Sequence, residues 1–446
     1  MRPLTAALLC STIVTTAHAQ DAAPEGRGDS LRRRADWRAS IAHVADSGAI
    51  VRRVAEGGSA ARGGLRVGDR IVAIGGTDVL ARSAYAPAFA ALRGGDTARL
   101  RVVRGGDTLA LRVSLTPVAY ERHHGTAVSY GAVLSSRGHR VRTVVARPTA
   151  AGNRRLPAIL FIPWLSCDAV ERPEAGTDGF MHTLHALAAN SEMLFMRVEK
   201  PGVGDSEGPP CRDAELDHDM AAFRAALAAL RSRPDVDSTR LFLVGGSIGG
   251  GLAPILAAED PRGIAGVVAI NGFGRTWYEH MLDIERRILE LRRLPAREVN
   301  AAMHGIARFY TEYLLGARTP AQVLASHPEL RALWTDEPAH QYGRPASYYH
   351  AVQRLDVEGA WATLAAREIP ALVVWGEYDW IMSRAEAERP IAIMNSRRAG
   401  LATLVVLPKT DHGLMTYASM PAAFADESPV WDGTPANAIL TWLRAR

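Results

Sequence analysis

The sequence predicts an α/β protein in which a doubly wound, mostly parallel sheet follows a small β-rich unit. Short, nearly continuous apolar runs alternate with helical stretches after residue 120, as is typical of a parallel sheet covered on both faces. Short alternating runs between glycine turns occupy residues 37–117, and a long helical stretch at 272–367 interrupts the strand rhythm. A chain of 446 residues also leads us to expect two domains rather than one.

Residues 1–19 predict a secretory signal peptide. Arg2 precedes an apolar run over 4–14, and Ala17-His18-Ala19 forms an A-x-A cleavage site. The apolar run is too short to span a bilayer, so we expect no membrane insertion. The mature protein is therefore expected in the periplasm or outside the cell, with a charged, flexible leader over 20–36.

The charge of the chain does not indicate a nucleic-acid partner. The formal net charge is +5, but Arg32–Arg34 is the only run of three basic residues, and the only lysines are Lys200 and Lys409. A protein that follows a phosphate backbone needs clustered basic residues. Nucleic-acid binding is therefore not expected.

The β-rich unit begins with strands and turns and continues with a helix and a hairpin. Gly63 and Gly64 end a short helix, because glycine readily adopts the left-handed conformation of a helix C-cap. The expected elements are a strand at 49–54, a turn and short helix at 56–61, a turn, strand and hairpin within 67–76, a helix at 84–92 and paired strands at 98–103 and 108–113.

Residues 37–117 resemble a bacterial PDZ domain. The resemblance rests on Gly58-Ser59-Ala60-Ala61, Gly64-Leu65, Gly68-Asp69-Arg70-Ile71 and Ile74-Gly75-Gly76. It implies a peptide or protein partner that binds as an added strand, with its C-terminal carboxylate held by backbone N–H groups. The family's carboxylate loop carries glycines that residues 39–44 lack, so a purely structural role is the alternative.

The second unit, expected over 120–446, alternates strands with helices. The helical stretch at 272–367 is too long for one crossover, and we expect it to form a cap over one end of the sheet. The other expected elements are a hairpin at 128–134 and 140–146, strands at 158–162, 193–198, 241–244, 266–270, 371–375 and 402–407, and helices at 181–189, 217–231 and 252–258.

The stretch Gly245-Gly246-Ser247-Ile248-Gly249 fits the G-x-S-x-G pattern between an apolar strand and a helix. A nucleophile on such a sharp turn takes a strained conformation, and side chains at Gly245 and Gly249 would collide with neighbouring elements. The turn exposes the Ser247 hydroxyl and directs the Ile248 N–H, at the start of a helix, toward developing negative charge. Ser247 is thus the predicted nucleophile and Ile248 a predicted oxyanion-hole donor.

A serine hydroxyl needs a base to take its proton, and base and acid follow the nucleophile here in the order Ser, Asp or Glu, His. Asp379 follows the strand at 371–375, and His412 follows the strand at 402–407. We therefore expect His412 as the base and Asp379 as the residue that orients it. Glu377 is the alternative acid.

The second oxyanion-hole donor is expected in the loop after the strand at 158–162. Pro163 has no N–H, so the donor is the backbone of Trp164 or, as the alternative, of Leu165. Trp164 is the preferred candidate.

Together these features resemble the α/β-hydrolase family. Residues 199–208 match the family's loop after its fourth strand, and residues 235–240 with Gly250 and Gly251 are similar to esterases and acyl-peptidases of the dienelactone-hydrolase and prolyl-oligopeptidase branches. In this family the loops that carry Cys167 and Cys211 share one rim. In an exported protein the pair implies a disulfide; two unrelated thiols are the alternative.

The predicted function is an exported serine hydrolase that cleaves carboxylic esters through an acyl-enzyme on Ser247. A small-peptide or acyl-aminoacyl peptidase is the alternative within the enzymes, and acyl transfer would use the same residues. The alternative from another class is a PDZ-type peptide-binding protein with an inactive hydrolase scaffold. No cofactor is expected and no metal site, since His182 and His185 share a helix face without supporting carboxylate or cysteine spacing.

Overall fold

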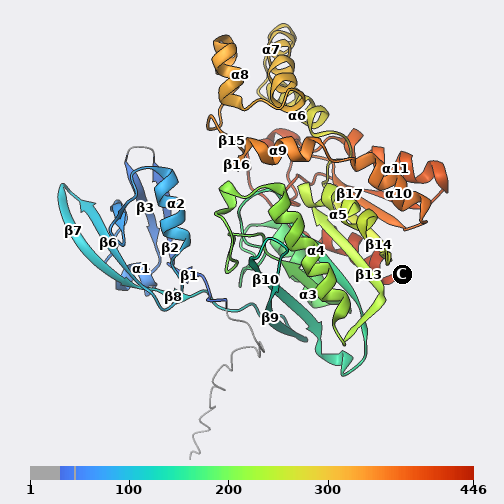
Figure 1. The fold of residues 1–446 in the computed structure, drawn as a ribbon, viewed down its shortest axis with the longest axis horizontal. Helices are drawn as coiled ribbons and strands as arrows, with labels where there is room; N and C mark the ends of the chain where they lie inside the picture. The colour runs from blue at the N-terminus through green and yellow to red at the C-terminus, as the bar shows by residue number, and fades with distance from the viewer. Residues whose placement is uncertain (1–30, 45–46) are drawn as a thin grey trace, which may run out of the picture.

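The computed structural model describes residues 31–44 and 47–446 (Figure 1). The predicted signal peptide at 1–19 lies outside the described residues, as does the expected leader up to residue 30. Within the described residues no helix combines the length and the apolar character needed to cross a membrane.

The N-terminal domain is a small sheet with two helices, and it stands beside the rest of the molecule in Figure 1. Its strands follow the order β2-β3-β4-β6-β7, with β5 paired to β4. Trp37, Val51, Ile71 and Val102 are buried in its core. The elements are β2 (Ala39–Val44), β3 (Gly48–Val54), α1 (Ser59–Arg62), β4 (Arg70–Ile74), β5 (Thr77–Asp78), α2 (Arg82–Ala90), β6 (Thr97–Arg104) and β7 (Asp107–Ser114).

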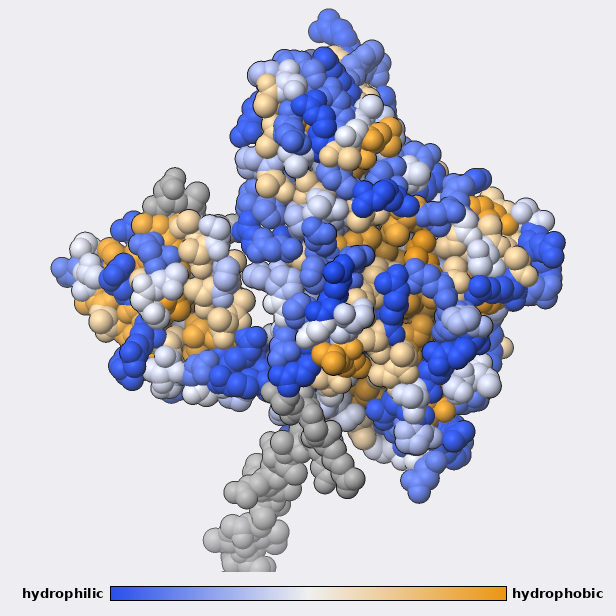
Figure 2. Space-filling model, in the orientation of Figure 1, coloured by the Kyte–Doolittle hydropathy of each residue, from blue (hydrophilic) through white to orange (hydrophobic). Residues whose placement is uncertain are grey.

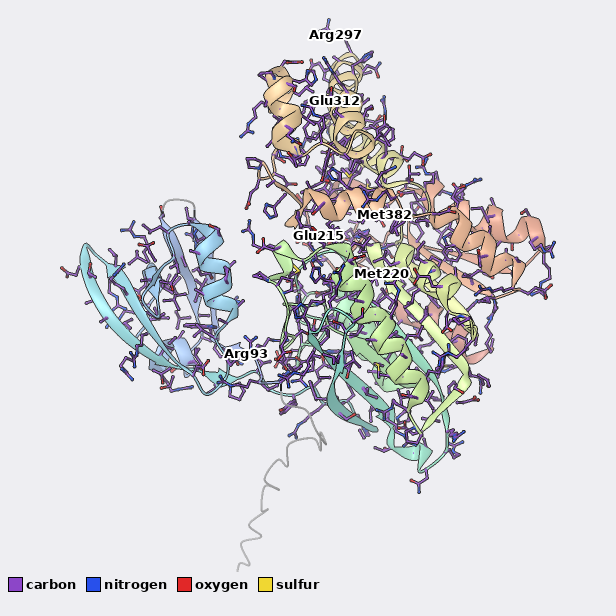
Figure 3. All side chains as sticks on the ribbon, viewed as in Figure 1. Arg93, Glu215, Met220, Arg297, Glu312 and Met382 are labelled. Carbon is purple, nitrogen blue, oxygen red and sulfur yellow. A yellow bond between two sulfur atoms is a disulfide. The ribbon has the colours of Figure 1, made fainter. Side chains whose placement is uncertain are left out.

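The two domains are joined by a two-stranded stalk, in which β1 (Ala35–Asp36) pairs with β8 (Thr116–Pro117). Figure 3 labels Arg93 in this region, where the Arg93 backbone forms an isolated antiparallel β-bridge with the Arg34 backbone. Arg33 is buried and pairs with carboxylates of the C-terminal domain. Residues 31–36 therefore differ from the flexible leader expected there, because long-range ion pairs hold them.

The C-terminal domain contains an eight-stranded sheet of order β18-β17-β14-β13-β11-β12-β10-β9. The pairs β9–β10 and β10–β12 are antiparallel and the remaining pairs are parallel. This is the mixed, mostly parallel sheet that the apolar runs predict. The strands are β9 (Thr126–Leu134), β10 (Arg140–Pro148), β11 (Leu156–Ile162), β12 (Leu194–Val198), β13 (Val236–Gly246), β14 (Gly266–Ile270), β17 (Ala371–Gly376) and β18 (Ala402–Leu407).

Helices cover both faces of this sheet. One face packs against α4 (Leu216–Ser232), α5 (Ile248–Glu259) and α11 (Arg384–Arg397), and α10 (Val357–Ala366) packs against α5 and α11. The other face packs against α3 (Gly179–Asn190) and α13 (Thr434–Arg444). Burial on both faces explains why the strands are apolar throughout.

A helical cap follows β14. Figure 1 shows α7 and α8 standing away from the sheet at the top of the molecule, and Figure 3 places Arg297 and Glu312 there. The range predicted for the cap also took in α10, which instead packs against α5 and α11. The cap consists of α6 (Trp277–Leu291), α7 (Ala296–Tyr310), a π-helical turn (Thr311–Leu315), α8 (Pro320–Ser326), the 3₁₀ turn Pro328–Leu333, β15 (His340–Gln341), β16 (Arg344–Pro345) and α9 (Ala346–Gln353).

Aromatic side chains hold the cap together. Phe309 stacks on Trp334 at 4.8 Å between ring centroids, and Tyr313 packs edge-on against both. Tyr310, Tyr313 and Trp334 are buried. In the face shown in Figure 2, hydrophilic residues predominate over the cap and apolar residues gather below it.

Candidate active site

The turn between β13 and α5 presents Ser247. Its backbone has φ +56° and ψ −125°, a conformation that a residue with a side chain rarely adopts. A Cβ at Gly245 would lie 2.0 Å from the Gly249 carbonyl oxygen, and a Cβ at Gly249 would lie 2.2 Å from the Ile162 carbonyl oxygen. Glycine is therefore required at both elbow positions for steric reasons.

Strand register brings the other predicted residues to the same edge of the sheet. Ile162 pairs with Gly245, so the loop after β11 starts beside the serine turn. Gly376 pairs with Leu407, so the loops after β17 and β18, which carry Asp379 and His412, leave the sheet side by side.

Ser247, His412 and Asp379 form a continuous hydrogen-bond chain. The Ser247 Oγ lies 2.9 Å from His412 Nε2, and His412 Nδ1 lies 2.8 Å from Asp379 Oδ2. The other carboxylate oxygen of Asp379 accepts hydrogen bonds from the backbone N–H groups of Ile381 and Met382. This order of groups suits removal of the serine proton by His412.

The electrostatic environment of His412 favours its protonated form. Burial alone would lower the pKa of His412, but the charge and hydrogen bond of Asp379 outweigh burial and raise the pKa above its ordinary value. Asp411 contributes in the same direction. Burial raises the pKa of Asp411 itself to about 6.

Two other acids lie in these loops, and their carboxylates accept hydrogen bonds from backbone N–H groups. Glu377 accepts a hydrogen bond from the backbone N–H of Lys409, and Asp411 accepts one from the backbone N–H of Met415. Asp379 is the carboxylate that reaches the imidazole.

Asn271, directly after β14, is a positioning residue that the sequence analysis missed. Its side-chain amide donates to the carbonyl oxygens of Asp411 and His412, at 3.2 and 3.0 Å, and its Oδ1 accepts from Gly376 N. Asn271 thus links the end of β14, the neighbour of the strand β13 that precedes Ser247, to the loop that carries His412. An asparagine at a strand end is a weak sequence signal, because turns favour the same residue.

The loop after β11 is held by a buried lysine. Lys200 Nζ donates to three consecutive backbone carbonyls, Trp164 at 2.8 Å, Leu165 at 3.1 Å and Ser166. Arg344 Nε adds a hydrogen bond of 3.3 Å to the Leu165 carbonyl. Burial and the neighbouring charge of Arg344 lower the pKa of Lys200 to about 7.

Trp164, Leu165 and Ile248 line the same cavity as Ser247. Because Lys200 and Arg344 occupy the carbonyl side of the loop, their hydrogen bonds restrain the orientation of its peptide groups. This arrangement is compatible with a backbone N–H of Trp164 or Leu165 facing a developing oxyanion beside Ile248 N–H.

Cys167 and Cys211 form a disulfide next to this loop. Cys211 is buried, and its carbonyl accepts a 2.7 Å hydrogen bond from Arg344. The disulfide and Arg344 therefore connect the loop after β11 with the loop before α4.

Replacing Cys167 and Cys211 together with serine is expected to lower the free energy of unfolding by about 4 kcal/mol, because the link spans a sequence separation of 44 residues. The freed loop should also lower kcat more than it raises KM. Urea unfolding and steady-state kinetics measure both effects. A count of two free thiols in the mature native protein would contradict the disulfide.

The cavity above Ser247 has a volume of about 780 Å³ and lies under the cap. Figure 3 places Met382, one of its lining residues, at the base of the cap. One wall is apolar and is formed by Ile284, Ile288, Trp380, Ile381 and Met382. The cavity therefore suits a substrate with an apolar portion beside the reacting carbonyl.

His280 adds a second imidazole to this cavity. It is buried on α6, and its Nδ1 lies 3.3 Å from Glu386 Oε2. The sequence analysis did not foresee this pair, since 106 residues separate its members.

Glu121, His123 and His185 also gather closely enough to hold a metal ion. Both Glu121 oxygens, however, already pair with the buried Arg197, and His185 Nε2 lies 3.0 Å from the Arg172 carbonyl. These ligand atoms are engaged by protein groups, so the cluster fits an ion-pair network better than a metal site.

The chain matches two family models. Residues 30–115 match the PDZ domain, and residues 197–416 match the alpha/beta hydrolase fold. These matches confirm the two resemblances and the fold class predicted from the sequence.

The chain is also similar to solved structures at low identity. A hypothetical protein from Pseudomonas aeruginosa has 14% identity over 72% of this chain and 94% of its own, with a TM-score of 0.44. An esterase from Pyrococcus furiosus has 12% identity over 72% and 91%, with a TM-score of 0.43. The ferulic acid complex of Est1E from Butyrivibrio proteoclasticus has 15% identity over 71% and 100%, with a TM-score of 0.43.

Proposed function

We propose that this chain, in which an α/β-hydrolase domain follows a PDZ domain, is an exported serine hydrolase that cleaves carboxylic esters. The observation that carries the proposal is the hydrogen-bond chain from Asp379 through His412 to Ser247, at the base of a largely apolar cavity. The predicted signal peptide and the disulfide support export, since disulfides persist in oxidising compartments.

In the first half of the reaction, Ser247 Oγ attacks the ester carbonyl carbon while His412 Nε2 takes the hydroxyl proton. The carbonyl oxygen becomes an oxyanion, which accepts hydrogen bonds from Ile248 N–H and from Trp164 N–H or Leu165 N–H. Asp379 stabilises the imidazolium. His412 then gives the proton to the leaving alcohol, and the acyl group stays on Ser247.

In the second half, His412 takes a proton from a water molecule that attacks the acyl-enzyme. The oxyanion forms at the same place, and the proton returns to Ser247 Oγ as the carboxylic acid leaves. These steps need no group beyond the residues named and water.

The test compares a panel of p-nitrophenyl esters with aminoacyl anilides, after labelling of the mature protein by a fluorophosphonate. Rapid turnover of the esters with little turnover of the anilides supports the ester hydrolase, and the reverse order supports the peptidase. A folded protein that neither reacts with the probe nor turns over either class would contradict the proposal and favour a peptide-binding protein.

Replacing Lys200 with methionine is expected to lower kcat by about 10²-fold, the cost of losing one oxyanion donor, because the loop after β11 would lose the amine that holds three of its carbonyls. KM should change little, since Lys200 does not line the cavity. Steady-state kinetics on p-nitrophenyl acetate measure both constants. Lys409→Met, at the other lysine of the chain, is the matched control and should leave kcat near the wild-type value.

The pH dependence of kcat/KM should show an acid limb that reports His412. The base must be neutral to accept the serine proton, so activity falls as pH drops through the raised pKa of His412. Asp411→Asn should move this limb toward lower pH, because the Asp411 charge helps to raise that pKa. Turnover above the limb should persist in this variant. An acid limb that stays in place in Asp411→Asn would contradict the assignment.

A further inference from the structure

A second cavity, with a volume of about 500 Å³, lies between the two domains. The PDZ domain contributes Trp37, Phe89, Ala90 and Leu92 to its lining. The hydrolase domain contributes residues of the rim loops, among them Cys167, Val203, Cys211 and Arg212. The disulfide-bearing rim of the candidate active site is thus one wall of an interdomain cleft.

The cleft adjoins the candidate active site. Ser166 and Tyr342 line both the cleft and the cavity that contains Ser247. Ser166 belongs to the loop that Lys200 holds, and Tyr342 lies in the turn between β15 and β16. These two residues therefore border both the cleft and the cavity that contains Ser247.

The position of the PDZ domain beside this rim is fixed at its base. Arg33 pairs with Glu171 at 2.9 Å and with Asp205 at 2.6 Å, and all three side chains are almost completely buried. The backbone N–H of Arg34 donates to Asp205 Oδ1 at 2.7 Å. Breaking such buried pairs leaves uncompensated charges, so the pairs of Arg33 restrain the domain relative to the rim.

One edge of the PDZ sheet leads into the cleft. Within the described strands β2 pairs only with β3, so its outer edge is open for an added strand. An added strand that runs antiparallel to β2 has its C-terminal end beside Ala39. Trp37 lies two positions before Ala39 in the sequence, and it lines the cleft.

At the end of this edge, Trp37 and Arg38 already contact neighbouring groups. Trp37 stacks on Phe89 with 5.0 Å between ring centroids. The Arg38 N–H, in the turn before β2, already donates to Asp36 Oδ1. Because Trp37 and Phe89 also line the cleft, a chain that extends beyond the end of β2 would enter the cleft.

We propose that the cleft is the second part of the substrate site, and that the substrate is an extended peptide whose C-terminal carbonyl is esterified. The peptide lies along β2 and the cleft, and its ester carbonyl passes Ser166 and Tyr342 to reach Ser247. The inference rests on the proposed function and uses the same steps: the peptide acyl group moves to Ser247 Oγ and then to water, and the alcohol leaves with a proton.

The test uses the full mature chain and a series of N-acetyl-oligoalanine p-nitrobenzyl esters with one to about eight alanines, since each extended residue adds about 3.3 Å. For the wild type, kcat/KM should rise about tenfold or more once the peptide is long enough to fill the cleft, because remote binding energy then contributes. Ala90→Trp, at an exposed position that lines the cleft, should abolish this gain. Arg212→Trp narrows the cleft from the hydrolase side and should act in the same way.

Ala110→Trp is the matched control, because Ala110 is exposed on β7, at the opposite edge of the PDZ sheet from β2. In this control, kcat/KM should still rise as the peptide becomes longer. The gain is measured within each variant, as the ratio of kcat/KM for the longest ester to kcat/KM for the one-alanine ester, so a change in the catalytic residues themselves cancels. Ala110→Trp should in addition hydrolyse p-nitrophenyl acetate at the wild-type rate. A wild-type kcat/KM that does not depend on peptide length would overturn the inference. So would a rise of kcat/KM with length that persists in both cleft variants. Neither result would contradict the proposed ester hydrolase activity.

Discussion

Ser247→Ala should abolish covalent labelling by a fluorophosphonate and lower kcat on p-nitrophenyl esters by about 10⁴ to 10⁶-fold. The alanine removes the oxygen that lies 2.9 Å from His412 Nε2, and no acyl-enzyme can form without it. The effect is large because nucleophile and base act as one unit. Gel fluorescence after labelling and initial-rate kinetics measure the two outcomes.

Ser166→Ala is the control for this variant, since Ser166 places another serine in the same cavity. Its hydroxyl bonds to Asp168, and Lys200 contacts its carbonyl instead. The control should keep both labelling and turnover. Labelling that persists in Ser247→Ala would assign the nucleophile to a different residue and end the present proposal.

Asp379→Asn should lower kcat by about 10⁴-fold with little change in the fold. The amide can still occupy the site, but it lacks the charge that stabilises the imidazolium and can favour the wrong tautomer of His412. Steady-state kinetics with circular dichroism as a check on folding measure the effect.

Glu377→Gln separates the two acids that the sequence left open. Its carboxylate bonds to the Lys409 backbone rather than to His412, so kcat should stay within a few-fold of wild type. If Glu377→Gln were the slower variant, Glu377 would be the orienting acid and the contact of Asp379 would be structural.

The proposed catalytic residues could be predicted because their signals are local and ordered along the chain. Apolar runs predict strands, and parallel strands end at one edge of a sheet, so Ser247, Asp379 and His412 are expected to converge there. The glycines around Ser247 follow from steric exclusion over a few residues. A pattern of this kind depends on short-range geometry, which sequence spacing describes well.

Other features depend on contacts between distant segments, and no spacing predicts them. Lys200 resembles a loop lysine in the sequence, yet 36 residues separate it from the Trp164 carbonyl that it holds. Arg33 looks like part of a charged leader in the sequence. In the structure it is buried and bonds to Glu171 and Asp205, which lie over a hundred residues away in the sequence. The strand β2 was missed because its residues are only partly buried, which weakens the apolar pattern that predicts a strand. Its pairing with β3 is what makes it a strand.

The apolar pattern, the glycine motif around Ser247 and the two family resemblances were therefore sufficient for the fold class, the domain order and the residues proposed for the reaction. The folded arrangement added groups that act on these residues or on their loops. Asn271 bonds to the histidine loop, Lys200 and Arg344 bond to the loop after β11, and the buried ion pairs of Arg33 lie at the base of the stalk. The physical reason is that a buried charge or amide is stable only where partners converge on it, and convergence of distant segments is a property of packing. The cleft shared by the two domains arises in the same way, from where the stalk places one surface against another.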